Sequence, residues 1–188
     1  MEISTEEKII LLNAARNSIK NVFEKTQIEK PEYDKYPLLK SKAGAFVTLS
    51  ENKILRGCIG YILGYQPLYD TVCDAAVQAA FHDPRFPPLE KHELNLISIE
   101  ISILSEPFPL NSYDEIILGK HGLIVEERGR RGLLLPQVPV EHKMNKEQYL
   151  DAICQKAGLP KNLWREKQIK LSGFTATIFS EESIKEEK

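Results

Sequence analysis

One short stretch of the sequence combines a thiol, a cation and two glycines, the residue types that a reactive or ligand-binding site requires. In LRGCIG, from Leu55 to Gly60, an arginine, Arg56, precedes Cys58 by two positions. If the stretch is extended, successive side chains point to opposite faces, so Arg56 and Cys58 share one face. A nearby cation favours the thiolate, which is the reactive form of cysteine. The spacing therefore predicts Cys58 as a nucleophile whose thiolate Arg56 stabilises.

The same stretch also fits a purely structural role. Free cysteine is among the most buried residue types, and a cysteine in an apolar strand is more often packed than reactive. Gly57 and Gly60 allow a ligand to approach closely, but they equally allow another backbone segment to do so. From these residues alone, both interpretations stay open.

A nucleophilic cysteine also needs a base and an orienting group. His121 lies between two glycines in GKHGL, where we expect an exposed turn at a sheet edge and a group that transfers protons, although an ordinary surface histidine fits as well. Arg85, in the loop FHDPRFPPL, could form an anion clamp with Arg56, because arginine presents a planar fork of donors. The alternative is that Arg85 pairs with Asp83 and fixes the loop.

Metal and nucleic-acid sites have little support in the sequence. The three cysteines, at positions 58, 73 and 154, form no CxxC pair, and no HxxxH or HExxH spacing occurs, so no metal site is predicted. No cofactor is indicated. A formal net charge of −2 lacks the basic excess that nucleic-acid binding usually shows, although a local patch at Arg128, Arg130 and Arg131 reads as a solvated hairpin tip.

The totals describe an ordinary globular protein. A chain of 188 residues with 42% apolar and 28% charged residues can bury a substantial core, so we expect one domain over residues 1–188. The odd cysteine count indicates a reducing compartment. Because the N-terminal residues do not resemble a signal peptide and no apolar run reaches the roughly 18 residues of a membrane span, we expect a cytoplasmic protein.

Hydrophobic spacing predicts the elements that position these residues. A capping box at Ser4 and Glu7 begins an amphipathic helix from Thr5 to about Glu24. Residues 44–50 and 53–60 form a hairpin around Glu51-Asn52, so the LRGCIG motif is its second arm. Pro67 opens a second helix with a narrow alanine stripe, which the proline-rich loop at 81–89 ends.

The second half of the chain has the same mixed character. The alternation of 96–107 predicts an antiparallel strand with one solvated face. A short helix at 112–118, a strand pair starting at Gly122 and Gly132, and a helix over 145–157 follow. Residues 168–180 read as one strand with a bulge at Ser172-Gly173, and 181–188 as a frayed charged tail. Helices and antiparallel strands in mixed order predict an α+β fold.

Several of these segments resemble the AMMECR domain family, named after a human chromosomal region linked to Alport syndrome, midface hypoplasia and elliptocytosis. The segments run in the same order from about residue 44 to 179: LRGCIG, AAFHDPRFPPL from Ala79, ISIEISILSEP from Ile97, KHGL from Lys120, LLLPQVPVE from Leu133, and QKAGLP with Trp164. The positions that match the family motifs are Leu55, Arg56, Gly57, Cys58, Ile59, Gly60, Asp83, Pro84, Arg85, Phe86, His121 and Gly122.

The resemblance implies a fold more than a reaction. It implies two unequal lobes built on antiparallel sheet with flanking helices, and a cleft between them that LRGCIG lines. Prokaryotic relatives are encoded beside, or fused to, a Memo-like protein and a radical-SAM protein, which implies a three-part system.

Two functions remain as alternatives. In the leading one, an enzyme or enzyme subunit binds a small anionic ligand through Arg56, Gly57, Gly60, Asp83 and Arg85, with Cys58 and His121 as catalytic residues. In the other, the protein is a non-catalytic adaptor of the three-part system, and LRGCIG is a structural hairpin.

Overall fold

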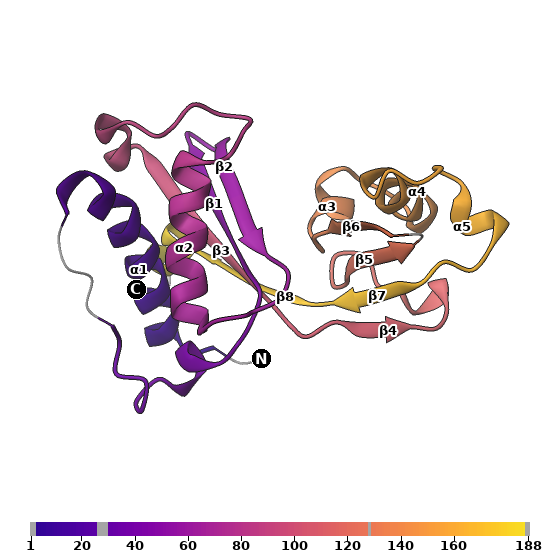
Figure 1. Ribbon diagram of the computed structural model, residues 1–188, viewed down its shortest axis with the longest axis horizontal. Helices are drawn as coiled ribbons and strands as arrows, with labels where there is room; N and C mark the ends of the chain where they lie inside the picture. Colours follow the sequence, from indigo (N-terminus) through magenta and orange to yellow (C-terminus); the bar gives the residue numbers. More distant parts are fainter. Residues whose placement is uncertain (1–2, 26–29, 128, 187–188) are drawn as a thin grey trace. The chain divides into compact units, whose positions relative to one another are not determined.

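The chain folds into two compact units, each with its own sheet and helices (Figure 1). The computed structural model describes residues 3–25, 30–127 and 129–186. Unit 1 comprises residues 1–104 and 177–188, and unit 2 comprises residues 105–176. Helices and antiparallel sheets together confirm the predicted α+β class. The single domain over residues 1–188 and the cleft between its lobes stay predictions.

Unit 1 is built on a four-stranded sheet in the order β2-β1-β3-β8. Its strands are β1 (Ala45–Glu51), β2 (Ile54–Tyr61), β3 (Ile97–Leu104) and β8 (Ala176–Ser180). β1 pairs in antiparallel orientation with both β2 and β3. The LRGCIG motif therefore lies on an edge strand, with β1 on one side only.

Helices cover one face of this sheet (Figure 1). They are α1 (Thr5–Glu24), α2 (Leu68–Phe81) and α6 (Glu181–Glu186), with short 3-10 turns η1 (Pro37–Lys40) and η2 (Lys91–Asn95). The predicted capping box of α1 and the start of α2 after Pro67 are confirmed. Alternate residues of β1 and β3 and the alanines of α2 are buried together, because a pleated strand turns every second side chain toward the helices.

The hairpin that carries the motif differs from the prediction in two details. Its turn is Asn52-Lys53 rather than Glu51-Asn52, and both turn residues have positive φ angles, 50° and 65°. Such angles twist a two-residue turn in the sense that a hairpin requires. The register also shifts between Leu49 and Ser50, which leaves Arg56 outside the strand pairing.

Unit 2 contains a second sheet, in the order β4-β7-β5-β6. Its elements are β4 (Phe108–Leu110), η3 (Tyr113–Glu115), β5 (Gly122–Glu127), β6 (Arg130–Leu134), α3 (Val138–Glu141), α4 (Lys146–Lys156), α5 (Leu163–Glu166) and β7 (Leu171–Phe174). Tyr149, Leu150 and Ile153 of α4 form a core with Leu123 and Val125 of β5. The predicted strand pair and helix are confirmed. Arg128 lies outside the described residues.

Three predictions for the second half of the chain are wrong. The helix expected at 112–118 is only the 3-10 turn η3. The strand expected at 168–180 is interrupted at Thr175, so that β7 and β8 belong to different sheets, and no bulge occurs at Ser172-Gly173. The expected tail is helical over Glu181–Glu186, because Glu181 pairs with Arg16 of α1 and Ile184 is buried. Residues 187–188 lie outside the described part.

Candidate functional site

The outer edge of β2 is occupied by the loop that follows α2. The backbone N–H of Cys58 donates to Asp83 Oδ2 at 2.9 Å, and Arg85 Nη2 donates to the Cys58 carbonyl oxygen at 3.3 Å. Both backbone groups of Cys58 thus point away from β1. An edge strand normally leaves such backbone groups unpaired, so that another chain can form hydrogen bonds with them. Here the loop satisfies them, and it joins the LRGCIG strand to the DPRF segment.

The Asp83 carboxylate holds this arrangement together. The residue is 4% exposed, and besides the Cys58 N–H it accepts bonds from the Arg85 backbone N–H at 3.1 Å, from Nε at 2.9 Å and from Nη2 at 2.6 Å. The hydrogen bonds from the Arg85 side chain hold the pKa of Asp83 well below its ordinary value, and backbone donors add to the effect against the opposing cost of burial. The predicted alternative, an Asp83–Arg85 pair that fixes the loop, is therefore present.

Arg56 is engaged with a different partner. Its Nε and Nη2 donate to Glu93 at 2.7 and 3.0 Å, and its Nη1 donates to the Pro87 carbonyl oxygen at 3.0 Å. The two side chains of the pair are only 12% and 14% exposed. All three guanidinium nitrogens are used within unit 1, so the predicted anion clamp of Arg56 and Arg85 is not formed.

The Cys58 side chain is half-buried, and its environment favours the protonated thiol over the thiolate. Burial raises the pKa of Cys58, while the hydrogen bond from Thr48 Oγ1, 3.3 Å from Sγ, and the charge of Arg85 lower it by less. The cation that acts on the thiol is therefore Arg85 and not Arg56, because Arg56 is paired with Glu93. The predicted stabilisation of a thiolate by Arg56 is wrong, and the neutral thiol is favoured near neutral pH.

The glycines of the motif are sites of close backbone packing. A Cβ atom on Gly57 would fall well inside van der Waals distance of the Ala79 carbonyl oxygen in α2. A Cβ on Gly60 would collide with the backbone of Ala45 and Phe46 in β1. Close approach of another backbone segment, one of the two predicted reasons for these glycines, is the one that the structure shows.

His121 lies in unit 2 and is not on an exposed turn. It is 9% exposed and precedes β5, an interior strand of its sheet, so the predicted exposed turn at a sheet edge is wrong. Its Nδ1 accepts the Ile117 backbone N–H at 3.4 Å, and its ring packs edge-on against Phe108 at 5.3 Å. The hydrogen bond from Ile117 to the His121 side chain thus closes the turn between these two residues. A proton-transfer role for His121 stays a prediction.

Unit 1 thus brings together six of the seven predicted site residues: Arg56, Gly57, Cys58, Gly60, Asp83 and Arg85. Sequence reasoning missed Glu93 and Thr48. Thr48 could have been found, because a hairpin with its turn at Asn52-Lys53 and one bulge pairs it with Cys58. Glu93 carried no such signal. It also accepts the Glu90 backbone N–H at 2.7 Å, which fixes its direction.

Within residues 3–25, 30–127 and 129–186, no group of three or more histidine, cysteine, aspartate or glutamate residues could hold a metal ion. Nor is any helix in those ranges long and apolar enough to cross a membrane.

The chain is similar to proteins of archaea and bacteria along most of its length. A sequence model of the family described as AMMECR1 matches residues 12–179. A protein of Thermococcus gammatolerans is 41% identical over 92% of this chain and 89% of its own length, and one of Aquifex aeolicus is 40% identical over 91% of each. The crystal structure of the uncharacterized protein PH0010 from Pyrococcus horikoshii is 39% identical, with a TM-score of 0.83 over 93% of this chain and 91% of that one.

Proposed function

Because this chain belongs to the AMMECR1 family, we propose that it is a non-catalytic adaptor in which LRGCIG is a structural hairpin, and that its partners are a Memo-like protein and a radical-SAM protein. One observation carries the structural part of the proposal. Each charged side chain of the motif and its loop has a partner inside unit 1: Asp83 with Arg85, and Arg56 with Glu93. Pairing inside unit 1 leaves these groups less charge and fewer free donors and acceptors for a ligand.

The state of the thiol supports the same proposal. A catalytic cysteine needs a lowered pKa or an adjacent base, and burial instead raises the pKa of Cys58. Its hydrogen-bonding neighbour is the Thr48 hydroxyl, which donates to the sulfur and does not remove its proton. The sulfur therefore serves unit 1 as a packed, weakly polar group.

Reconstitution tests the adaptor role directly. The chain would be mixed with the Memo-like and radical-SAM proteins from its own genome, and complex formation measured by sedimentation. We expect the wild type and Cys58→Ala to form the complex equally well, with Cys73→Ala as the matched cysteine control. Absence of any complex with the wild type contradicts the partners, and selective loss with a folded Cys58→Ala contradicts the structural role of the motif.

A second candidate, the binding of a small anion beside Cys58, rests on the exposure of Arg85. Its side chain is 54% exposed, although two bonds to Asp83 hold the guanidinium in place. A fixed and accessible guanidinium can bind a carboxylate or phosphate at little entropic cost. In this function Arg85 binds the anion, and Cys58 lies next to it as a thiol.

Alkylation of Cys58 tests both candidates. Because its pKa is raised, we expect iodoacetamide to modify Cys58 more slowly than glutathione at neutral pH, with rates compared over a pH series by peptide mass spectrometry. If Arg85 binds anions, the anionic reagent iodoacetate should alkylate Cys58 faster, relative to neutral iodoacetamide, than it alkylates glutathione. Arg85→Gln should abolish this relative increase in rate. Modification faster than glutathione restores the nucleophile hypothesis. An unchanged reagent preference in Arg85→Gln excludes the anion site.

A further inference from the structure

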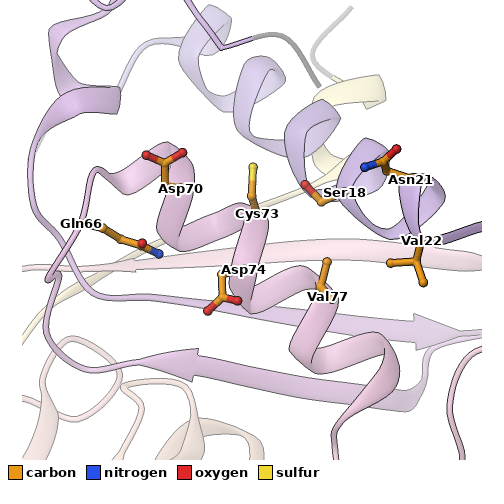
Figure 2. A pocket seen from close by; sticks show the side chains of 8 residues that line it. All are labelled: Ser18, Asn21, Val22, Gln66, Asp70, Cys73, Asp74 and Val77. Carbon is orange, nitrogen blue, oxygen red and sulfur yellow. The ribbon is translucent and has the colours of Figure 1, made fainter. Parts of the chain in front are cut away.

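Unit 1 contains a pocket of about 530 Å³ between α1 and α2, and no residue of the LRGCIG motif lines it (Figure 2). Ser18 and Val22 reach it from α1, and Asp70, Cys73, Asp74 and Val77 reach it from α2 (Figure 2). Cys73 and Asp74 follow Asp70 by three and four positions and precede Val77 by four and three, which places the four residues on one helical face. The volume lies within the range of roughly 300–1,000 Å³ of small-molecule sites.

The polar wall of this pocket is acidic. Asp70 and Asp74 lie one helical turn apart, and the nearby Cys73 is half-buried with a pKa that burial raises, so the thiol adds no charge. Asp74 accepts the Tyr61 hydroxyl hydrogen, a neutral partner. Asp70 pairs with Lys30 at 3.4 Å, but the lysine side chain is 66% exposed. Such a surface pair is weak and is readily exchanged for another cation.

A buried hydroxyl in the same pocket is left without a proper hydrogen bond. Ser18 is 4% exposed, and its Oγ has no hydrogen-bond partner of normal geometry among the described residues. Figure 2 shows the hydroxyl turned from α1 toward Cys73. Burial raises the pKa of that thiol, and the interaction with Ser18 opposes the rise in part. Buried polar groups in folded proteins are nearly always paired. A hydroxyl oxygen without a proper partner, beside two carboxylates, can accept a hydrogen bond from a ligand that carries N–H donors.

We propose that the pocket between α1 and α2 binds a small organic cation, an alkylammonium or alkylguanidinium compound. Its charge is balanced by Asp70 and Asp74, an N–H group donates to Ser18 Oγ, and its alkyl part contacts Val22 and Val77. The carboxylates exclude an anion by charge. A bare metal ion does not fit, because the described donors there form no set of three. The site is independent of the adaptor role proposed above.

Calorimetry on the full chain at low salt tests the charge requirement. The probes are cadaverine and agmatine, which carry ammonium and guanidinium groups, and the controls are pentanediol, with the same length but no charge, and glutarate, with the opposite charge. We expect at least one of the two cations to bind and neither control to do so. Binding of pentanediol as tight as that of cadaverine, or no binding of either cation, overturns the proposal.

Two conservative variants locate the site. Asp70→Asn and Asp74→Asn each remove one charge, and we expect each to weaken cation binding roughly tenfold, the loss of one charge-assisted hydrogen bond. Glu106→Gln, an exposed residue of unit 2, removes the same charge elsewhere and should leave the affinity unchanged. An unaltered affinity in both aspartate variants, with thermal unfolding like the wild type, refutes the site.

Protection of a thiol gives a readout that does not depend on the variants. Cys73 lines the pocket, whereas Cys58 belongs to the edge of β2. A saturating concentration of the bound cation should slow the modification of Cys73 by N-ethylmaleimide severalfold and leave Cys58 unaffected, as followed by peptide mass spectrometry. Equal rates at Cys73 with and without the cation contradict the proposed position of the ligand.

Discussion

The edge of β2 and the pocket between α1 and α2 contain the same chemical groups in opposite states. Each has a half-buried thiol, at least one carboxylate and a hydroxyl. At the β2 edge the carboxylate of Asp83 accepts bonds from two residues and the Thr48 hydroxyl has the sulfur as its partner. In the pocket the Ser18 hydroxyl has no proper partner in the described ranges, and its Asp70 neighbour holds only an exposed lysine.

Residue types alone therefore do not distinguish a ligand-binding site from a structural hydrogen-bond network. Burial raises the pKa of both thiols, so the sulfur atoms do not separate the two regions. What separates them is whether the polar groups around each sulfur are satisfied. A satisfied buried network stabilises one conformation, whereas unused hydrogen-bonding capacity is available to a ligand.

The largest expected effect is that of filling the close contact between β2, the strand that carries the motif, and α2. In Gly57→Ala the new methyl group would press on the Ala79 carbonyl oxygen, and backbone cannot move aside as a side chain can. We expect the free energy of unfolding to fall by about 3 kcal/mol, the upper end for overpacking. Urea unfolding measures it. Gly129→Ala is the control, because no atom of the described residues lies within 4 Å of its added methyl and only its φ of 74° opposes alanine. A Gly57→Ala loss no larger than the control's shows that β2 is not tightly packed against α2.

The next effect is that of neutralising Asp83. Asp83→Asn weakens the pairing with Arg85, and because Arg85 is half-exposed we expect a loss of only about 2 kcal/mol at neutral pH. The pKa of Asp83 is lowered by folding, so its stabilisation is complete above the unfolded value of about 3.9 and is lost progressively as the pH falls from there through the lower pKa of the folded protein. Urea unfolding at pH 7 and about pH 3 should show the difference between wild type and variant shrinking in acid. A difference that is constant with pH, or matched by the exposed Asp34→Asn, contradicts the role of the charge.

Much of the fold could be predicted because its signals are local. The capping box at Ser4, the alternation of β3 and the glycine after α4 each depend on neighbours within a few residues, and all three elements are present. The errors arose where distant contacts decide. The alternation in 168–180 cannot show that its two halves join different sheets. The charged sequence 181–186 does not show that Glu181 will pair with Arg16 of α1 and that Ile184 will be buried.

In the candidate site, too, the local contacts could be predicted from the sequence and the distant ones could not. Sequence spacing correctly brought Asp83 and Arg85 together, since they are two residues apart in a rigid loop. It could not predict that Arg56 pairs with Glu93, which is 37 positions away, and it therefore predicted an interaction of Arg56 with the nearer Cys58. The α1–α2 pocket was missed for a related reason. Its residues read as ordinary helix surface, and only the packing of α1 on α2 brings Ser18 and Asp74 to one pocket.

The smallest effect has the opposite sign and tests the unpaired hydroxyl itself. Ser18→Ala removes a buried group without a proper partner, so we expect the free protein to gain about 0.5–1 kcal/mol in unfolding free energy. Asn17→Ala, exposed on the same helix, measures the part due to helix propensity alone. Thr48→Val should instead lose stability, because it breaks the hydrogen bond to Cys58. If Ser18→Ala also destabilises, the hydroxyl is bonded to Cys73 in the free protein, and the pocket resembles the β2 edge. A gain beyond the Asn17→Ala value, together with weaker cation binding, would mean that Ser18 is kept for a ligand at a cost in stability.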